Sequence, residues 1–325
     1  MTAGTSFDSP LFHYSFGPHR PMLRVDPGAR LRITCPDSDN ALADGTVLPA
    51  SRRQRDDATA LFEGNPLAGP IEVTGACPGD EIRVELHAVT LDRDYGQTLI
   101  APGHGAVPGR MLEPLRDDGS RESVPRHMFR WQIDRAAGTA RLANPIGRAP
   151  VEVPLDPFVG CIGVCPRWGQ AISSLYSGDF GGNLDVRLMR PGATVHLPVF
   201  REGGLLFVGD LHAAQGDGEV IGGAIETSGV VDCTIGLERG TGLKSVRISS
   251  AERIGAVGVG GDLALAVQHA YGHLLNWVDD LTPLNRWDAY NLLSQCAHVT
   301  IGNMLESSCS AAASVPRSLF SISDV

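Results

Sequence analysis

Proline-glycine pairs divide the first two thirds of this chain into short hydrophobic runs. Three of these pairs, at positions 27–28, 78–79 and 191–192, stand between runs in which apolar and polar residues alternate. Alternation with a period of two is typical of half-buried strands, and Pro-Gly is typical of tight turns. The 39 glycines and 22 prolines among 325 residues also suit many short strands better than a helical protein. The sequence therefore predicts a mainly β body.

The pattern changes near Gly261, where alternation gives way to helical spacing. Apolar residues between 263 and 278 recur every three or four positions, and Asp262 stands where a helix cap is expected. Asn285 is placed to cap a second helix, predicted over residues 286–302. The tail from Ser307 ends without a clear pattern. The predicted fold is mainly β with α+β character: a β-sandwich or barrel body and a helix-containing C-terminal part.

Two stretches, 37–63 and 92–130, show little periodicity and are expected to be loops. Loops of that length inside a compact domain are often functional. We expect an N-terminal β-rich domain over residues 1–165. A second domain over 166–325 would combine strands and helices and carry the motif described next.

Residues 209–226, GDLHAAQGDGEVIGGAIE, contain the densest group of chemically active side chains in the chain. They follow an apolar run that predicts a strand, and on a strand Asp210 and His212 lie on the same face. Carboxylate oxygen and imidazole nitrogen together suit zinc or another divalent ion. Asp210 and His212 are therefore the first candidate metal ligands.

Two glutamates in the same motif are further candidates. Glu219 and Glu226 are an odd number of positions apart, so on a regular strand they would face opposite ways. A bulge at the glycines 222–223 would bring both to one face. We favour Glu219 as general base or ligand and keep Glu226 as an additional ligand candidate.

The loop between these residues holds two polar side chains with less specific signals. Asp217 precedes a glycine in a common turn pair, so it serves either the turn or the chemistry. Gln215 either hydrogen-bonds a substrate amide or satisfies the loop backbone. Both are retained as candidate catalytic residues.

Other candidates lie outside the motif. Asp37 and Asp39 follow a predicted strand and are either metal ligands or part of a solvated turn. Asn183 and Asp185 alternate onto one face and form either a site wall that orients a ligand or a hairpin tip. His104, in a loop rich in glycine and proline, is a candidate substrate contact.

The motif GDxHAxQGDGE, with GGNxD upstream, resembles the acetamidase/formamidase family of metal-dependent amide hydrolases. The resemblance covers about half of the chain, over residues 65–86, 158–166, 180–227 and 289–305. It implies the β body with an α+β C-terminal part, a bound divalent metal, and hydrolysis of small linear amides to carboxylate and ammonia. It also favours a site role for Asp37 and Asp39. Residues 103–138 follow no pattern of this family.

The resulting hypothesis is metal-assisted hydrolysis in which Glu219 or Asp217 takes the proton of the attacking water. Zinc is the favoured ion, with calcium or another divalent ion as the alternative. A cupin-like metalloenzyme would use similar ligands, but it favours His-x-His where this chain has Asp210. A non-catalytic β protein stabilised by calcium is disfavoured by His212, because calcium sites seldom use histidine.

Charge and targeting signals limit the partners and the location. The net charge of −10 argues against a nucleic-acid partner, which requires a basic face. The sequence shows no signal peptide and no apolar segment of membrane-spanning length, and its seven cysteines are odd in number and scattered. We therefore expect a cytoplasmic protein with no membrane partner, a small amide as substrate, and a homo-oligomeric state.

Overall fold

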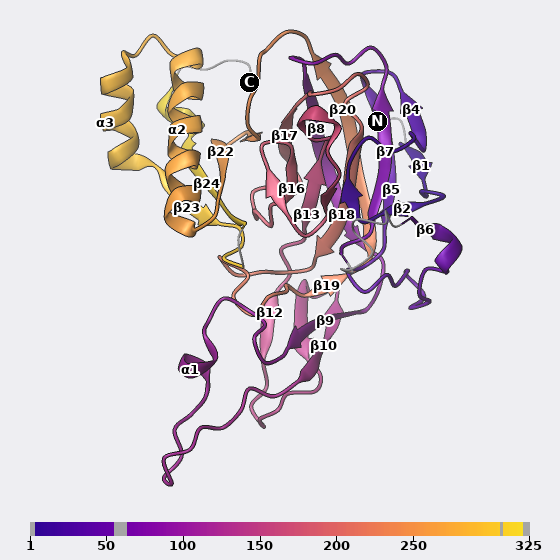
Figure 1. Cartoon of the computed structure of the whole chain (residues 1–325), viewed down its shortest axis with the longest axis vertical. Coiled ribbons are helices and arrows are strands. Elements are labelled where there is room, and N and C mark those ends of the chain that lie inside the picture. Colours follow the sequence, from indigo (N-terminus) through magenta and orange to yellow (C-terminus); the bar gives the residue numbers. More distant parts are fainter. Residues whose placement is uncertain (1–3, 55–63, 306–307, 321–325) are drawn as a thin grey trace.

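A computed structural model of the chain describes residues 4–54, 64–305 and 308–320. Within these ranges two large sheets and a two-stranded sheet make up the body, and two long helices lie along one side (Figure 1). The mainly β fold class predicted from the sequence is confirmed. Positions 55–63 of the expected loop, Ser307 and residues 321–325 of the tail lie outside the described residues. None of the described helices combines the length and the hydrophobicity needed to cross a membrane.

The first sheet combines strands from both ends of the chain. In the described residues its order is β1 (Thr5–Phe7), β5 (Ala29–Cys35), β20 (Gly229–Glu238), β8 (Glu81–Leu91), β17 (Ala193–Pro198), β21 (Arg247–Ser250), β22 (Arg253–Gly260), β24 (Cys309–Pro316) and β23 (His298–Ile301). Strands β1 and β5 are parallel, and the other neighbours are antiparallel. The turns at 27–28, 78–79 and 191–192 come directly before β5, β8 and β17, as predicted.

The second sheet carries the motif. Its main path through the described residues is β12 (Glu152–Pro154), β11 (Thr139–Leu142), β10 (His127–Asp134), β9 (Tyr95–Ile100), β19 (Glu226–Thr227), β18 (Leu206–His212), β13 (Phe158–Gly163), β16 (Gly181–Asn183) and β15 (Ser177–Gly178). Four more strands extend it beside β18: β7 (Leu67–Val73), β2 (Phe12–His13), β4 (Leu23–Val25) and β6 (Arg53–Gln54). Strands β14 (Ile172–Ser173) and β3 (Ser15–Phe16) form the separate pair.

The main core lies between the two large sheets. Fully buried side chains of both sheets belong to one apolar cluster, for example Ile33 and Val84 of the first sheet and Ile71 and Val208 of the second. Burial of one such side chain contributes roughly 1.5–3 kcal/mol. The motif strand β18 therefore lies on a rigid, well-packed base.

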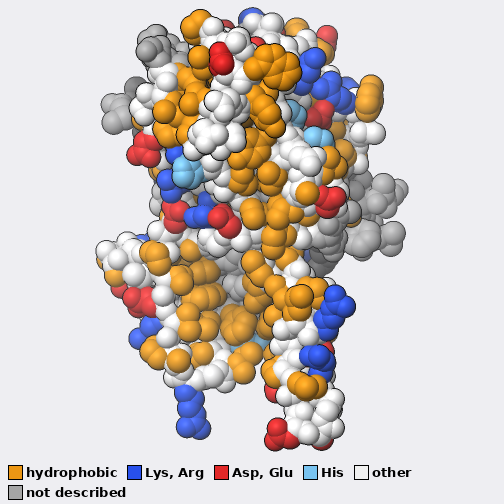
Figure 2. All heavy atoms as spheres, turned by 90° about the vertical axis from the view of Figure 1, so that its left-hand side faces the viewer, with side chains coloured by type: hydrophobic (Ala, Val, Ile, Leu, Met, Phe, Trp, Pro, Cys, Tyr) orange, Lys and Arg blue, Asp and Glu red, His pale blue; other side chains and the backbone are white. Residues whose placement is uncertain are grey.

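The lower end of the molecule is formed by β9, β10 and β12 and by the segment that contains the short helix α1 (Gly109–Leu112) (Figure 1). A hollow separates two projections there, and hydrophobic side chains gather around it (Figure 2). The sequence predicted only loop over 92–130, so strand β9 and the start of β10 are corrections. Both pair along their length, with Met128 opposite Leu99.

Helix α2 (Leu263–Leu281) packs against β22 and β24, and helix α3 (Arg286–Cys296) packs against α2 (Figure 1). Both predicted caps are confirmed, since the Asp262 carboxylate accepts from the amide of Leu265 and Asn285 accepts from the first amides of α3. Helix α2 approaches β22 closely because Gly258 has no side chain. A Cβ atom there would stand 2.1 Å from the Ala266 oxygen.

The C-terminal segment differs from the prediction in two places. The second helix ends at Cys296 rather than at residue 302, and His298–Ile301 forms the edge strand β23. Its Val, Thr and Ile residues favour extended backbone, which explains the earlier end. The C-terminal tail, in which the sequence shows no clear pattern, contains β24. This strand is buried on both faces, so apolar and polar residues do not alternate along it. Both large sheets draw strands from either side of residue 165, and the division into two domains stays a prediction.

Candidate metal centre

Strand β18 presents Asp210 and His212 to the same side, as the motif predicted. Both side chains are buried, and the Asp210 Oδ2 atom lies 3.4 Å from the His212 Nε2 atom. Asp210 has a backbone φ of 59°, in the left-handed region that non-glycine residues seldom adopt. This turn of the backbone lies opposite Gly160 on the neighbouring strand β13.

Glu226 reaches the same imidazole from the next strand. Strand β19 pairs with β18 so that Glu226 lies opposite His212, and its Oε1 atom is 3.5 Å from His212 Nε2. Glu219 and Glu226 do not share a strand, because the glycine-rich turns between them break it. Both glutamates line the same cavity. Their odd spacing in the sequence therefore does not make the two glutamates point in opposite directions.

Gln215 fixes the orientation and tautomer of His212. Its amide nitrogen donates to two backbone carbonyls, those of Asp185 at 2.9 Å and Gly302 at 3.1 Å. Because carbonyls only accept, the amide oxygen of Gln215 must face His212 Nδ1, 2.8 Å away. His212 Nδ1 therefore carries a proton, and in the neutral ring Nε2 presents a lone pair to the carboxylates.

Two more carboxylates complete the cluster. The ligand atoms of Asp185, His212 and Glu219 lie within 4.8 Å of one another, as do those of Asp210, His212 and Glu226. Asp185 and Glu219 also have positive φ values, 52° and 47°. Three of the six non-glycine residues with positive φ in the described ranges are thus carboxylates of this cluster. Such strain is typical of functional sites.

A glycine provides the space in which these groups meet. A Cβ atom on Gly160 would stand 2.7 Å from Asp210 Oδ2, 2.8 Å from Asp185 Oδ1 and 2.9 Å from His212 Cε1. Real Cβ atoms do not approach polar atoms so closely. Any side chain at this position would displace the candidate ligands.

Burial and mutual repulsion raise the pKa values of the carboxyl groups. Burial is the largest cause for Glu226, whose pKa is raised to about 8, and for Asp185, whose pKa is raised to about 7. The pKa of Glu219 is also raised well above its ordinary value, first by burial and then by the charge of Asp185. Burial lowers the pKa of His212, but the charges of Glu226 and Asp210 outweigh this effect and raise it. The ring and the carboxyls thus retain protons when no cation neutralises them.

These residues fit a divalent metal ion. Several buried polar atoms of the cluster have no hydrogen-bond partner: His212 Nε2, Glu226 Oε2 and Asp185 Oδ1. Unpartnered buried acceptors are costly unless a cation or proton satisfies them. Both ligand groups share His212, and its Nδ1 is occupied by Gln215. The imidazole can therefore serve one ion at a time, through Nε2.

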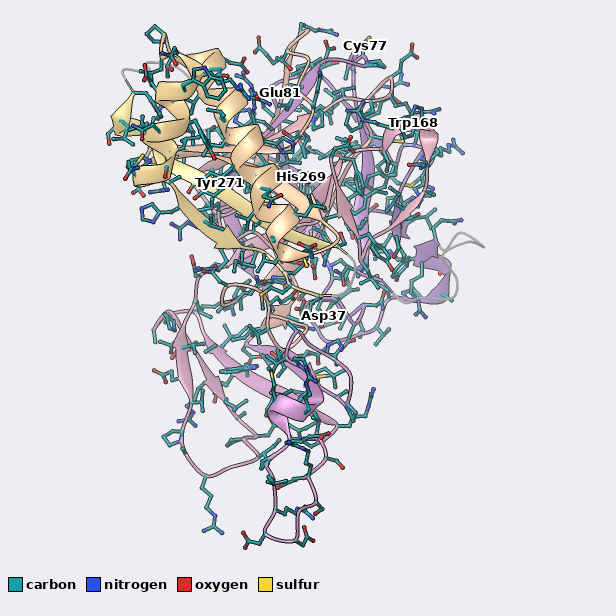
Figure 3. All side chains as sticks on the ribbon, turned by 60° about the vertical axis from the view of Figure 1, so that its left-hand side comes forward. Asp37, Cys77, Glu81, Trp168, His269 and Tyr271 are labelled. Carbon is teal, nitrogen blue, oxygen red and sulfur yellow. The ribbon has the colours of Figure 1, made fainter. Side chains whose placement is uncertain are left out.

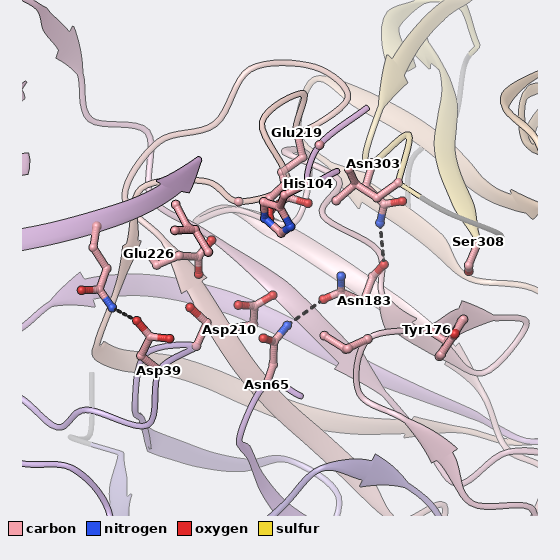
Figure 4. A pocket seen from close by; sticks show the side chains of 18 of the residues that line it. Asp39, Asn65, His104, Tyr176, Asn183, Asp210, Glu219, Glu226, Asn303 and Ser308 are labelled. Atoms are coloured by element: carbon pink, nitrogen blue, oxygen red, sulfur yellow. Dashed lines mark hydrogen bonds between the residues drawn. The ribbon is translucent and has the colours of Figure 1, made fainter. Parts of the chain in front are cut away.

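The cluster opens into a cavity of about 330 Å³ (Figure 4). Its described lining consists of Ser38, Asp39, Asn65, Gln97, Leu99, Gly103, His104, Gly105, Met128, Leu175, Tyr176, Asn183, Asp210, Glu219, Gly222, Gly223, Glu226, Asn303, Leu305 and Ser308. Of the candidates from outside the motif, Asp39, Asn183 and His104 are part of this lining. His104 Nε2 lies 2.9 Å from the carbonyl oxygen of Gly222, which holds the start of the 103–126 segment at the rim.

Two sequence candidates lie elsewhere. Asp37, which Figure 3 labels between the body and the lower end of the molecule, is not part of the cavity lining. It is buried in an ion pair with Arg93, at 2.6 Å. Asp217 forms a partly exposed ion pair with Arg187, at 2.8 Å. Neither carboxylate is placed among the ligand groups. A catalytic or metal role for either one receives no support from these contacts.

The sequence reasoning missed Asn303, Asn65 and Cys161, which support the cluster together with the predicted Asn183. Asn303 and Asn183 both donate to Asp185 Oδ2, at 2.8 and 2.9 Å, and Asn65 donates to Asn183 at 3.0 Å. The buried Cys161 thiol lies 2.8 Å from Asn183 Oδ1, and burial raises its pKa well above the ordinary value. Asn65 and Cys161 lie inside the stretches that resemble the family. This position is the sequence feature that could have identified them as site residues.

The sequence profile of the Acetamidase/Formamidase family matches residues 170–254, which include the whole motif. This match confirms the resemblance to the acetamidase/formamidase family that the motif predicted. Over 266 residues the chain is 29% identical to a formamidase of Methylophilus methylotrophus, covering 69% of this chain and 63% of that protein. The match thus spans less than two thirds of this acetamidase/formamidase relative.

Crystal structures of acetamidases show the same fold. The acetamidase from Yersinia enterocolitica superposes with a TM-score of 0.78 at 28% identity, over 98% of this chain and 94% of that one. An acetamidase from Bacillus halodurans gives a TM-score of 0.78 at 24% identity, over 97% of this chain and 98% of that one. The latter similarity concerns the fold alone.

Proposed function

We propose that this chain hydrolyses the C–N bond of a linear amide and releases a carboxylate and ammonia. Its similarity to proteins named formamidase and acetamidase supports the reaction class. The observation that carries the proposal is the unpartnered His212 Nε2 atom, which faces buried carboxylates at the base of a cavity.

Asp210, His212 and Glu226 would hold the metal ion. One nitrogen and two carboxylate ligands favour zinc, which in catalytic sites takes three protein ligands and leaves one position open. When bound, such an ion lowers the pKa of water and polarises a carbonyl group. Asp210 and Glu226 line the cavity, so the open position would face the substrate.

Glu219 would move the proton. Its carboxyl group lines the cavity, and burial together with Asp185 raises its pKa. A raised pKa makes this carboxylate a stronger base, which suits it to accept the proton of the attacking water and return it to the amide nitrogen. The hydroxyl adds to the carbonyl carbon, the C–N bond breaks, and the protonated nitrogen leaves as ammonia.

Asn303 would orient the substrate amide. Its side-chain nitrogen is engaged by Asp185, whereas its Oδ1 atom is buried without a partner, and the residue lines the cavity. An acceptor in this position suits the N–H groups of a primary amide. Gln215 would act through His212, by keeping the Nε2 lone pair available.

A homo-oligomer is proposed as the working form. Met111 and Leu115, on the projection at the lower end, are 71% and 67% exposed, and an assembly would cover such apolar side chains. Sedimentation velocity at micromolar concentration tests this, and a purely monomeric protein would contradict it. The cytoplasmic location stays a prediction.

Ammonia release from formamide, acetamide and longer amides, measured before and after chelation, tests the function. We expect release that stops when the metal is removed and returns when zinc is added. Protein that contains stoichiometric metal but releases no ammonia from any amide would contradict the proposal and favour a cupin-like or non-catalytic role. Activity that survives complete metal removal would contradict the metal assignment alone.

A further inference from the structure

We propose that the substrate is an uncharged primary amide with an apolar acyl group, as large as a branched alkyl chain or one aromatic ring. The inference rests on the proposed amidase function and adds the size and polarity of the acyl group. It follows from the volume of the cavity, from the residues of its walls and from their charge.

The cavity is much larger than formamide or acetamide. Its volume is about 330 Å³, whereas a cavity of about 10–15 Å³ is enough to hold one water molecule. Pockets that bury drug-sized ligands begin at about 300 Å³. A substrate as small as acetamide would leave most of this space to water.

The wall at the Tyr176 end, away from Asp210 and Glu226, contains apolar side chains beside the polar Asn183 and Ser308 (Figure 4). Leu175 and Tyr176 are 41% and 40% exposed although they line the cavity, and Leu305 lines it as well. In Figure 4, Tyr176 lies at the opposite end from Glu226, with Asp210 between them. An amide whose carbonyl group reaches Asp210 would therefore extend its acyl group toward Tyr176 and cover these exposed side chains.

A second apolar surface comes from the lower end of the molecule. Leu99 and Met128 line the cavity and lie opposite each other on the antiparallel strands β9 and β10. Residues directly opposite in such a pair point to the same face of the sheet. The cavity thus offers apolar side chains from two separate places: the β9–β10 pair, and the turn between β14 and β15.

The charge of the lining excludes anionic acyl groups. The described lining contains no Lys or Arg, and its charged residues are the carboxylates Asp39, Asp210, Glu219 and Glu226. Even with a divalent ion bound, a substrate carboxylate would find no cation at the Tyr176 end. Neutral amides are therefore favoured over amides that carry a carboxylate.

A series of primary amides tests the proposal: acetamide, isobutyramide, phenylacetamide and the anionic succinamate, assayed with zinc-loaded protein. We expect kcat/KM for phenylacetamide to exceed that for acetamide by at least about 10-fold, since one methylene in an apolar pocket changes kcat/KM about 10-fold or more. Succinamate should be the poorest substrate. Acetamide preferred over phenylacetamide would overturn this inference while leaving the amidase function standing. Inertness of the whole series would instead contradict the amidase function.

Variants of the cavity wall test which residues determine the preference for phenylacetamide over acetamide. Tyr176→Ala should lower the ratio of kcat/KM for phenylacetamide to that for acetamide about 10-fold, and Leu175→Ala should lower it in the same direction. Tyr290→Ala, which removes an exposed tyrosine from α3, is the matched control and should leave the ratio unchanged. An unchanged ratio in both cavity variants would overturn the proposal. A changed oligomeric mass in Tyr176→Ala without a changed ratio would assign this surface to a subunit interface and also overturn it.

Discussion

The amide oxygen of Gln215 accepts a hydrogen bond from Nδ1 of His212, at 2.8 Å. Two backbone carbonyls accept hydrogen bonds from the amide nitrogen of Gln215. Gln215 is therefore always the acceptor and His212 Nδ1 always the donor. A side chain that sequence reasoning assigned to the substrate or to the loop backbone thus prepares the histidine for a metal. Outer contacts of this kind orient a metal-binding histidine, fix its tautomer and raise its basicity as a ligand.

Gln215→Leu should therefore weaken zinc binding on the order of 10- to 100-fold, because His212 loses its fixed tautomer. Competition with a chromophoric chelator measures the dissociation constant. Gln268→Leu, an exposed position on α2, is the matched control and should bind zinc like the original protein. Equal affinity in both variants would contradict the role assigned to Gln215.

Gly160→Ala should abolish stoichiometric metal binding while the protein still folds. The added Cβ would stand within 2.9 Å of three candidate ligand groups. Metal content and circular dichroism check the two parts of this prediction. Gly272→Ala, where a Cβ meets nothing within 4 Å, should keep its metal and gain up to about 1 kcal/mol of helix stability. A metal-replete Gly160→Ala protein would show that the cluster is not where the ion binds.

The metal-free protein should lose stability as the pH rises from about 4 to about 8. Folding raises the pKa of Glu226 to about 8 and that of Asp185 to about 7, and it also raises the pKa of His212. The folded state then binds more protons than the unfolded state across this range, so the free energy of unfolding falls as these protons are lost.

Thermal unfolding of chelated protein at pH 5.5, 7 and 8 measures this effect. The Tm should fall by several degrees, in proportion to the lost free energy. Glu226→Gln should flatten the slope, and zinc should raise the Tm more at pH 8 than at pH 5.5 because binding displaces protons. The same slope in the chelated protein and in Glu226→Gln would refute the assignment.

Glu219→Gln should lower kcat by at least about 100-fold, the usual contribution of a general base. Asp217→Asn should leave kcat unchanged, since its carboxylate is paired with Arg187 and is partly exposed. Steady-state ammonia release with zinc-loaded variants decides between the two residues. The reverse result would restore Asp217 as the base.

Asp37→Ala should destabilise the protein by about 3–5 kcal/mol, because it leaves the Arg93 guanidinium buried without its partner. Urea unfolding measures the change. Asp44→Ala, which removes a carboxylate that hydrogen-bonds only within its own turn, should cost less than half as much. Equal effects would show that the Asp37–Arg93 pair does not stabilise the fold.

The sequence predicted those parts of the site whose geometry is local. Asp210 and His212 are two positions apart on one strand, so period-two alternation was enough to place them together. Gln215 and both glutamates follow within the same segment. Local patterns could not predict the role of Asp37, because its partner Arg93 is 56 positions away in the sequence.

The remaining site residues come together only through the sheet order. Asn65, the neighbours Gly160 and Cys161, and Asn303 lie in three separate parts of the chain, and pairing of β13, β16 and β18 brings their surroundings into contact. The sequence reasoning also missed the strands β9 and β24. Strand β24 is buried on both faces, so its residues lack the alternation that identifies half-buried strands.

Three carboxylates of the cluster hold their backbone in the left-handed region, at φ values of 52°, 59° and 47°. Glycine adopts this conformation without strain, and asparagine adopts it more readily than most residues. Random mutagenesis followed by selection for heat resistance alone should therefore enrich Gly or Asn at Asp185, Asp210 and Glu219. Such a selection would replace these three carboxylates. The chain keeps them for their chemistry, at a cost in stability.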